Sequence, residues 1–466
     1  MKQLLHPLLY CWLFCWTAFG MKTMAQDLKP EKTNRILFLL DVSASMDNQW
    51  HSGGGSKMDA ARQVLDEQID KLKLKPNMEI ALRVFGSLSP YTANDCSDTK
   101  LLVPFGKANI PYIKEAINTV RPNGVTPIAM SLQKAADDFP ADENARNIII
   151  MITDGEESCG GDPCAISLAL QKKQIFLRPF VIALDNEDAM AQKFECMGNY
   201  YRASSPETLR NSLAAIVDLA LNPTYVQVDL LDLNGRPSET DVDLSFSDTY
   251  THLDKYQYYQ TITYTGVPDT LNLDPVTRYD LTVHTIPEIV KTGISLKPNQ
   301  VNFVNVPAPQ GFLLVKMQTP SIDNYINNKI KCIIRQQGQQ GTTNVQKMNT
   351  SEKYLCGHYD LEFLTLPRTR IPDIDIAESQ TTTIQIPAPG QLSINKSYPV
   401  FGGIFYYHNN RWELLYELNQ NLGNESVALQ PGTYRLVYRS KNARKTTDSK
   451  IQTITITGGS NASVTL

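Results

Sequence analysis

The feature that most constrains the fold is a pair of apolar runs that each end in small polar residues. Ile36–Leu40 is a continuous apolar stretch, and Asp41-Val-Ser43-Ala-Ser45 follows it directly. Arg146–Ile152 is a second run, and Thr153-Asp154-Gly155 follows it. Short uninterrupted apolar runs are typical of strands that are buried on both faces. We therefore predict two central strands of a sheet covered by helices, with Asp41 and Asp154 at their ends.

Helical patterns alternate with strand patterns as far as residue 221. Apolar residues recur at helical spacing over Lys57–Leu72, and Met78–Phe85 then alternates as a strand does. Pro127 suits a helical first turn, and Ser205 suits a helix cap. The remaining elements are expected at 110–120, from 127, at 165–174, 175–184, 189–197 and 206–221. This alternation predicts a Rossmann-like α/β domain with a mostly parallel sheet between helices.

Oxygen-bearing side chains gather at the predicted strand ends, where ligands bind such sheets. The candidate metal ligands are two carboxylates and three hydroxyls: Asp41, Ser43, Ser45, Thr126 and Asp154. A hard cation such as Mg²⁺ prefers an oxygen-only set, with Ca²⁺ and Mn²⁺ as alternatives. The set leaves one coordination position that water fills or that an acidic group of a partner takes. The pattern therefore favours binding over catalysis.

These residues resemble, in order and context, the metal-ion-dependent adhesion site of von Willebrand factor type A domains. Asp41, Ser43 and Ser45 match the D-x-S-x-S loop of that family. Thr126 matches the threonine of its second loop, and Asp154 matches the aspartate of its third. The resemblance implies that the serines and the threonine contact the metal, while the aspartates bind it directly or through water.

The resemblance covers residues 33–221, and the segments Pro127–Leu132 and Thr153–Cys164 are similar to bacterial exported members. It implies adhesion or complex assembly through a protein ligand that supplies an Asp or Glu carboxylate. Two features depart from the best-known members: an insert at Trp50–Ser56 lengthens the first loop, and the third loop contains cysteines. The identity of the ligand therefore does not carry over.

Beyond residue 222 the sequence turns to Thr, Tyr, Val, Asn, Pro and Gln in period-two alternation, which is typical of β-sandwiches. Val304–Lys316 and Ile384–Lys396 share one pattern around Pro-Ala-Pro, and Tyr-x-Leu motifs begin at Tyr279, Tyr359 and Tyr434. The turn before Tyr434 resembles those of carboxypeptidase-regulatory-like and immunoglobulin-like sandwiches. The repeat predicts three all-β modules, at 225–307, 310–388 and 390–466. A single large irregular β domain is the alternative.

The N-terminus has the pattern of a signal peptide over residues 1–25. Lys2 precedes an apolar stretch from Leu4 to Phe19, and the small-residue cleavage site ends at Ala25. Cleavage predicts an exported protein, in the periplasm or at the surface of a bacterial cell. An uncleaved membrane anchor is the alternative. No later stretch reaches the roughly 18 apolar residues of a spanning helix.

The charge balance argues against nucleic-acid binding. The chain carries 44 basic and 48 acidic residues, and signal cleavage removes two lysines and no acids. The mature chain is therefore mildly acidic, and it lacks the basic footprint that a phosphate backbone attracts.

An even number of cysteines in an exported chain predicts disulfides. Four cysteines precede residue 222 and leave three connectivities open: Cys96, Cys159, Cys164 and Cys196. One connectivity closes the short loop from Cys159 to Cys164 and leaves Cys96 for Cys196. The two later cysteines, Cys332 and Cys356, are expected to pair with each other. A zinc site is the alternative for such a set.

Three classes of function fit these observations unequally. An enzyme needs a base or nucleophile beside the metal, and the nearest candidates lie on predicted loops: Asp47, His51 and Glu156. We therefore expect no enzyme. A binding protein needs only the open metal site and a spacer, so we favour a receptor, adhesin or assembly factor. A structural envelope protein, in which the β modules bind glycan or partner proteins and the metal only staples the fold, is the alternative.

Aromatic clusters in the β region offer a second surface to consider. Tyr256–Tyr259, Phe405–Tyr407 and Trp412 have the ring faces that stack on glycans. Aromatic residues in alternating strands more often pack in cores or across strands. We therefore expect packing, with glycan binding as the alternative.

Overall fold

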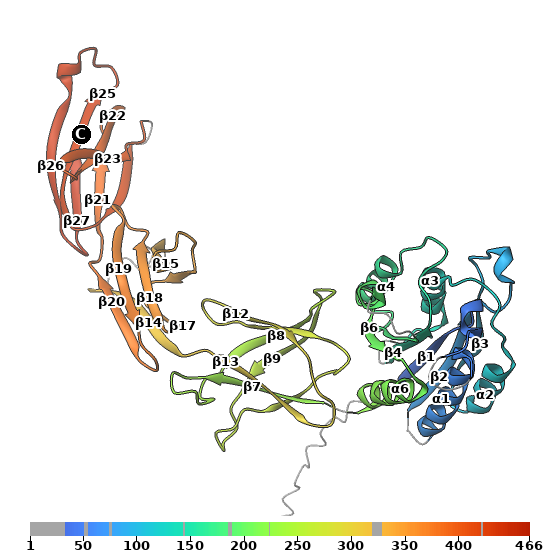
Figure 1. Cartoon of the computed structure of the whole chain (residues 1–466). Helices are drawn as coiled ribbons and strands as arrows, with labels where there is room; N and C mark the ends of the chain where they lie inside the picture. The colour runs from blue at the N-terminus through green and yellow to red at the C-terminus, as the bar shows by residue number, and fades with distance from the viewer. Residues whose placement is uncertain are drawn as a thin grey trace, which may run out of the picture.

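Figure 1 shows four folded units in sequence order, an α/β domain followed by three all-β modules. The computed structural model describes residues 33–50, 55–73, 77–142, 145–184, 189–222, 224–318, 329–420 and 423–466. The predicted signal peptide and residues 51–54 of the predicted insert lie outside these ranges. In the described ranges, no helix is both long and apolar enough to cross a membrane. The predicted fold class, α/β and then β modules, is confirmed.

The α/β domain is built on a six-stranded sheet in the order β3-β2-β1-β4-β5-β6. All neighbouring strands are parallel except β2 and β3, which are antiparallel. The strands are β1 (Asn34–Asp41), β2 (Met78–Phe85), β3 (Thr99–Gly106), β4 (Arg146–Thr153), β5 (Phe180–Ala183) and β6 (Asn199–Arg202). The helices are α1 (Lys57–Leu72), α2 (Ile110–Thr119), α3 (Ile128–Asp138), α4 (Pro163–Lys172), α5 (Ala189–Phe194) and α6 (Pro206–Leu221), with 3-10 turns η1 (Ala44–Asp47) and η2 (Tyr91–Ala93).

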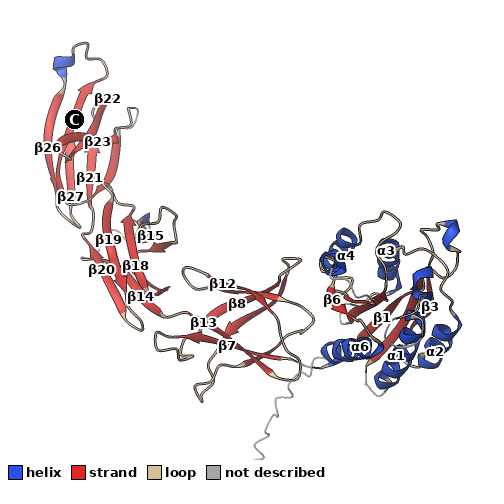
Figure 2. Cartoon of the chain, viewed as in Figure 1, coloured by secondary structure: helices blue, strands red, loops and turns tan. Residues whose placement is uncertain are grey.

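The side chains of β1 alternate between two apolar cores, one on each face of the sheet. Figure 2 shows the helices that lie around this sheet. Ile36, Phe38 and Leu40 pack with residues of α1, α2 and α6. Leu37 and Leu39 pack with residues of α3 and α4. Because both faces are buried, the strand is apolar throughout and shows no alternation in sequence.

Local signals fix most helix ends in this domain. Ser56 and Ser205 accept hydrogen bonds from the third residues of α1 and α6, and each forms a capping box. Pro127 is the N-cap of α3 and not a first-turn residue as predicted, because the helix begins at Ile128. Two edge strands, β3 and β6, were not predicted, and β5 is shorter than its apolar run.

Each β module consists of a three-stranded and a four-stranded sheet around a core of its own. The first strand of each module pairs in parallel with its last strand. Module 1 contains β7 (Tyr225–Leu231), β8 (Val242–Asp248), β9 (Asp254–Gln260), β10 (Thr270–Asn272), β11 (Tyr279–Val283), β12 (Ile289–Ile294) and β13 (Val301–Pro307).

Modules 2 and 3 repeat this topology. Module 2 contains β14 (Gln310–Met317), β15 (Lys331–Gln336), β16 (Asn344–Lys347), β17 (Thr350–Leu355), β18 (Gly357–Phe363), β19 (Thr369–Ile376) and β20 (Thr381–Ile386). Module 3 contains β21 (Gly390–Asn395), β22 (Val400–His408), β23 (Arg411–Glu417), β24 (Asn424–Leu429), β25 (Gly432–Ser440), β26 (Lys450–Ile456) and β27 (Asn461–Thr465), with the 3-10 turn η3 (Thr446–Asp448).

The tyrosines of the sequence repeat hold one structural position. Tyr279, Tyr359 and Tyr434 are all at most 3 % exposed. Their hydroxyls donate to main-chain carbonyls four or five residues upstream, in Asp274, Leu355 and Gln430. A buried tyrosine that ties a turn to the strand after it is a known corner device of β-sandwiches. This shared contact explains why the repeat is readable in the sequence.

Neighbouring modules are joined by a repeated contact. The carbonyl of Ile286 accepts from the amide of Leu355 at 2.8 Å, and the carbonyl of Leu366 accepts from the amide of Gln430 at 2.7 Å. Ile286 and Leu366 also pack against the core of the following module. The modules are therefore linked by matched surfaces as well as by the chain.

The contacts between the α/β domain and module 1 include an ion pair, an apolar contact and the guanidinium of Arg178 over the ring of Tyr250. The guanidinium of Arg146, at the start of β4, pairs with the carboxylate of Asp274. Val276, two residues further on, packs into the core of the α/β domain. The turn of module 1 that accepts the hydrogen bond of the corner tyrosine therefore also contacts the α/β domain.

The expected disulfide between Cys332 and Cys356 is wrong, because both are free thiols. Cys332 points from β15 into the core of module 2, whereas Cys356 lies between β17 and β18 with its amide bonded to the carbonyl of Pro309. Burial raises the pKa of Cys332 to about 12 and that of Cys356 to about 11. The pair was predicted because only these two cysteines remained. It does not form because Cys332 lies in the core of module 2, whereas Cys356 lies near the connection to module 1.

Candidate metal centre

Asp41 and Asp154 leave the sheet at the same edge because β1 and β4 are parallel neighbours. Leu40 is in register with Ile152. Asp41 is the last residue of β1, and Asp154 is the first residue after β4. Their residues are 0 % and 7 % exposed. The topology therefore buries two carboxylates, distant in sequence, at one point of the sheet.

The carboxylate of Asp41 is held by two hydrogen bonds. One oxygen accepts from the amide of Ser43 at 2.8 Å, and the other accepts from the hydroxyl of Thr153 at 2.6 Å. Burial raises the pKa of Asp41 to about 7, and the negative charge of Asp154 contributes to that rise. The two hydrogen bonds lower the pKa but do not offset burial. This carboxylate therefore lies where a positive charge is favoured.

Three hydroxyls lie in front of the carboxylates. The hydroxyl oxygens of Ser43 and Ser45 are 3.1 Å apart, and Ser45 donates to Asp154 at 2.7 Å. The Cβ position of Gly155 lies 3.6 Å from the Thr126 hydroxyl and 3.9 Å from the Ser45 hydroxyl. The structure therefore brings all five candidate ligands to the same strand edge.

A lysine that the sequence reading did not assign to the site lies in it. The ammonium of Lys57 is 2.8 Å from the second oxygen of Asp154. The side chain of Lys57 is 18 % exposed, and that of Asp154 is 0 % exposed. Asp154 therefore already has a cationic partner, which belongs to the chain itself.

The lengthened first loop delivers this lysine. Gln49 and Ser56 form an isolated antiparallel bridge, and the amide of Lys57 donates to the carbonyl of Asn48. Trp50 is 4 % exposed and anchors the loop in the core. Lys57 is the first residue of α1, an end of a helix that disfavours positive charge. A lysine at this unfavourable helix end was the sequence signal that a carboxylate elsewhere in the chain pairs with it.

Two glycines let the loops of the site approach one another. Gly86 has a positive φ of +73°, and a Cβ there would lie 2.8 Å from the Cα of Ser43 and 2.6 Å from the carbonyl of Val125. A Cβ on Gly124 would lie 2.8 Å from a carboxylate oxygen of Asp98. A side chain at either position would separate the first loop from the segment that carries Thr126.

Glu157 braces the third loop without being a candidate ligand. Its carboxylate accepts from the amide of Ala129 at 2.7 Å and from the amide of Cys159 at 2.7 Å. The first contact places a negative charge at the start of α3, where the helix dipole favours it. The hydroxyl of Ser158 also accepts from the amide of Thr126 at 2.8 Å. The second and third loops are therefore fixed to each other.

Two disulfides close this part of the domain, in the connectivity Cys96–Cys159 and Cys164–Cys196. The pairing of Cys159 with Cys164, which would have left Cys96 for Cys196, is not the one formed. Cys96–Cys159 ties the loop after β2 to the third loop of the candidate site. Since these four cysteines are oxidised, they do not form the alternative zinc site.

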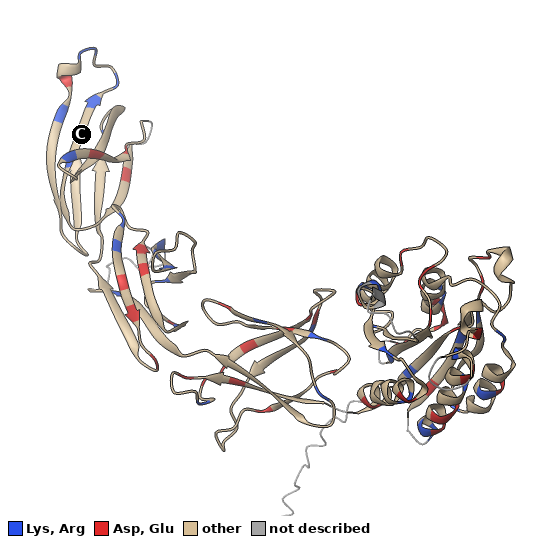
Figure 3. Cartoon of the chain, viewed as in Figure 1, with Lys and Arg blue, Asp and Glu red and all other residues tan. Residues whose placement is uncertain are grey.

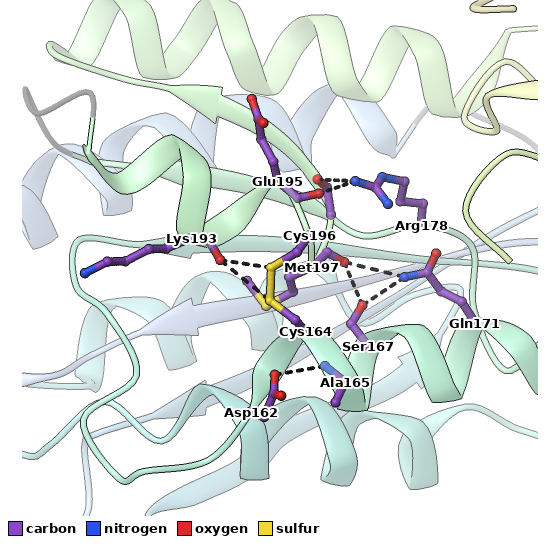
Figure 4. Close-up of a disulfide and its surroundings, with 11 residues drawn as sticks. Asp162, Cys164, Ala165, Ser167, Gln171, Arg178, Lys193, Glu195, Cys196 and Met197 are labelled. Carbon is purple, nitrogen blue, oxygen red and sulfur yellow. Dashed lines mark hydrogen bonds between the residues drawn. A yellow bond between two sulfur atoms is a disulfide. The ribbon is translucent and has the colours of Figure 1, made fainter. Parts of the chain in front are cut away.

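Figure 4 shows the second disulfide, which lies at the start of α4. Ser167 donates from α4 to the carbonyl of Met197 at 2.7 Å, close to Cys196. The Cys164–Cys196 bridge therefore reinforces a helix-to-loop contact that hydrogen bonds already make.

The donor set fits a divalent cation. Hydroxyl and carboxylate oxygens are the ligands that Mg²⁺ prefers, and the buried carboxylates favour a cation. Among the residues that the structure describes, no three His, Cys, Asp or Glu side chains come together as a metal site. A metal at this edge would therefore depend on the hydroxyls of Ser43, Ser45 and Thr126.

The parallel sheet with one antiparallel edge and the oxygen cluster at its strand ends define a domain of the von Willebrand factor type A class. The family model described as von Willebrand factor type A domain matches residues 36–157. That range contains all five candidate ligands.

One relative of this domain is the uncharacterized protein YwmD of Bacillus subtilis (strain 168). It is 33 % identical over 142 residues, which are 29 % of this chain and 61 % of YwmD. The chain therefore spans less than two thirds of the length of that relative.

Two solved structures also overlap with the chain. The pilus adhesin SpaC of Lactobacillus rhamnosus GG covers 94 % of this chain and 88 % of its own length, with 10 % identity and a TM-score of 0.35. Proximal thread matrix protein 1 from the mussel byssus, with a zinc-occupied MIDAS motif, covers 41 % of this chain and 46 % of its own length, with 19 % identity and a TM-score of 0.33.

Replacing Lys57 is predicted to strengthen metal binding. In Lys57→Gln, the metal no longer competes with an ammonium for Asp154, so we expect about five- to ten-fold tighter Mn²⁺ or Mg²⁺ binding by titration calorimetry. Added metal should also raise the melting temperature more than in the parent protein. Lys71→Gln, at the other end of α1, is the control. Unchanged or weaker binding in Lys57→Gln would contradict competition at Asp154.

Removing the Cys96–Cys159 bridge is predicted to weaken metal binding. A Cys96→Ser/Cys159→Ser protein loses about 2–5 kcal/mol of stability and frees the third loop, so its metal affinity should fall. The matched control is Cys164→Ser/Cys196→Ser, which removes a bridge away from the five ligands. Calorimetric titration of both proteins checks the prediction, and an equal loss of affinity in both would contradict it.

Proposed function

We propose that this chain is an exported binding protein of bacterial envelopes, which captures an acidic protein ligand through a divalent cation held by its type A domain. The observation that carries the proposal is the convergence of Ser43, Ser45 and Thr126 in front of two buried carboxylates. Neutral hydroxyls bind a cation without cancelling its charge. A cation in such a site keeps its attraction for a further carboxylate.

Each residue has a distinct part in this proposal. The hydroxyls of Ser43, Ser45 and Thr126 would hold the metal, with Asp154 bound directly or through water. Asp41 would act from behind, because both of its oxygens are engaged by Ser43 and Thr153. The bound cation would supply an electrophilic position that a ligand carboxylate can occupy.

The charges of the site explain why capture would require the metal. Asp41 and Asp154 together with Lys57 give a formal charge of about −1, which repels an acidic ligand. A divalent cation offsets both carboxylates, even when Lys57 moves away from Asp154. The metal therefore removes the repulsion of an acidic ligand.

Apolar side chains beside the site support a protein ligand. Leu88 is 56 % exposed and Tyr91 is 64 % exposed. Both lie in the loop that Cys96–Cys159 ties to the third loop. Exposed apolar and aromatic side chains are typical of the buried core of protein interfaces.

The predicted signal peptide, the two disulfides and the row of β modules support export and display. Disulfides persist in oxidising compartments. In Figure 1 the three modules lie between the α/β domain and the far end of the chain. In this proposal the far end of the chain is attached, and the modules keep the metal site at a distance from that end.

Binding without turnover is part of the proposal. Glu156, one of the candidate bases, pairs with Lys193 at the surface. Asp47 is exposed, and His51 lies outside the described residues. A structural envelope protein is the second candidate. The pairing of Lys57 with Asp154 favours a structural role for this site, because it ties two segments of the domain together.

Substitution of either aspartate is predicted to abolish capture. Asp41→Ala and Asp154→Ala remove the charge that holds the metal, so captured partners should fall to background in pull-downs from bacterial envelope extract with Mg²⁺ present. Chelator should have the same effect on the unaltered protein. Asp47→Ala, in the same loop but outside the ligand set, is the control and should capture normally.

Two results would decide against the proposal. Capture that persists in chelator would remove the metal from the mechanism. Metal binding that stabilises the fold while capture is unaffected by either aspartate substitution would favour the structural role. Mass spectrometry of the captured fraction, compared between Asp154→Ala and Asp47→Ala, separates specific partners from background.

A further inference from the structure

The four-stranded sheet of module 3 turns an unusual face to solvent. The side chains on this basic–aromatic face come from β22, β23 and β25, and its main members are Phe401, Tyr407, Trp412, Leu414, Arg435 and Arg439. Tyr407 pairs with Trp412 across β22 and β23, and Phe401 pairs with Arg439 across β22 and β25. The alternate residue Ile404 is 0 % exposed in the core, so this set points away from it.

Several apolar side chains on this face are strongly exposed, whereas Phe401 and Trp412 are half-buried. Tyr407 is 58 % and Leu414 is 55 % exposed, and Ile451 on the neighbouring β26 is 65 % exposed. A Cβ on Gly403 would lie 2.4 Å from Leu414, so this glycine makes room for the side chain that crosses it. These aromatic and aliphatic groups are therefore not core residues, and packing within the module does not explain them.

The other two modules provide an internal comparison. The residue after the corner tyrosine faces outward in every module and is Asp280, Asp360 and Arg435 in turn. Two residues further on, module 3 has Val437 where module 2 has Glu362. The position after the corner tyrosine is thus acidic in two modules and basic in the third.

The charges of module 2 are also satisfied internally, in contrast to module 3. Glu362 is surrounded by three guanidinium groups at 3.1 Å, those of Arg335, Arg368 and Arg370. In the described part of the chain, neither Arg435 nor Arg439 has a carboxylate within ion-pair distance. One carboxylate, Glu417, shares the face opposite Gly403. The face therefore keeps positive charge available for a ligand.

The two arginines lie over aromatic rings instead. The guanidinium of Arg435 is 4.0 Å from the centre of the Trp412 ring, and that of Arg439 is 5.4 Å from the centre of the Phe401 ring. The rings of Tyr407 and Trp412 are 5.4 Å apart and tilted by 55°. Cation–aromatic contacts hold both guanidinium groups over these rings. One nitrogen of Arg439 also donates to the carbonyl of Ala443 at 2.7 Å, so fewer of its donors than those of Arg435 remain for a ligand.

The whole module carries the same bias. Residues 390–466 contain 8 basic and 4 acidic residues, whereas residues 224–308 contain 5 basic and 11 acidic residues. Figure 3 shows blue Lys and Arg positions toward the outer end of module 3, whereas red and blue positions are mixed in the α/β domain. The chain is therefore electrically polar along its length.

We propose that the basic–aromatic face of module 3 binds an anionic polysaccharide. Exposed rings offer flat surfaces for the C–H faces of sugar rings, and guanidinium groups offer paired donors for sugar carboxylates. Both kinds of group lie on neighbouring strands of one sheet. The site lies at the opposite end of the chain from the metal centre (Figure 1). The chain thus has an attachment end as well as a capture end.

The test measures binding of the full mature chain to polygalacturonate, a polymer of acidic sugars, by calorimetry at low and high salt. We expect binding that weakens with salt and that falls at least ten-fold in Arg435→Asp, which restores the residue type of modules 1 and 2. Lys297→Asp, an exposed change of equal charge in module 1, is the control and should bind normally. Tyr407→Ser removes a ring without changing charge and should weaken binding several-fold.

Two further polymers identify the chemistry. Neutral dextran should not bind, and polyglutamate should bind more weakly than polygalacturonate and without dependence on Tyr407. Equal binding of dextran would overturn the role of charge. Equal binding of polyglutamate, with no effect of Tyr407→Ser, would overturn the sugar assignment in favour of acidic proteins. Parental affinity in a folded Arg435→Asp protein would overturn the site itself.

Discussion

The burial of two carboxylates at one edge of a parallel sheet is the constraint on which the rest of the α/β domain depends. Parallel neighbours end at the same edge, so Asp41 and Asp154 meet wherever β1 and β4 pair. Charge taken out of water is costly unless donors or cations offset it. The surrounding loops supply those donors, from Ser43, Ser45 and Thr153. Lys57 supplies the only full positive charge that contacts Asp154 among the described residues.

This arrangement makes the site responsive to an external cation. The ammonium of Lys57 pairs with Asp154. Burial and the neighbouring charge of Asp154 raise the pKa of Asp41 to about 7. A divalent ion held by the hydroxyls would stabilise both carboxylates. The same lysine that stabilises the domain therefore opposes the metal, so the affinity of the site reflects a balance between two cations.

The sequence was informative where the signal is local. The apolar run Ile36–Leu40 and the cap at Ser205 predicted their elements well, because burial on both faces and hydrogen bonding at a helix start act within a few residues. The contact between Lys57 and Asp154 and the bridge between Cys96 and Cys159 could not be predicted, because each depends on the approach of distant loops. The edge strand β3 was missed because it is half exposed and contains Pro104.

The β modules show the same division between core and surface. The tyrosine corner and the joint carbonyls recur because each module must close its own sandwich and seat its neighbour. Outward-facing residues are not under that constraint, and the modules differ most at these positions. Module 1 has Asp280 where module 3 has Arg435. A repeated scaffold with one altered face is a simple way to give the two ends of a chain different tasks.

The central claim is that the hydroxyl cluster holds a divalent metal that competes with Lys57. The most direct measurement is anomalous X-ray diffraction from crystals of the protein soaked in Mn²⁺. The account predicts a manganese peak in contact with the hydroxyls of Ser43, Ser45 and Thr126, with the ammonium of Lys57 moved away from Asp154. Lys57 still paired with Asp154 and no peak at the hydroxyl cluster would contradict it.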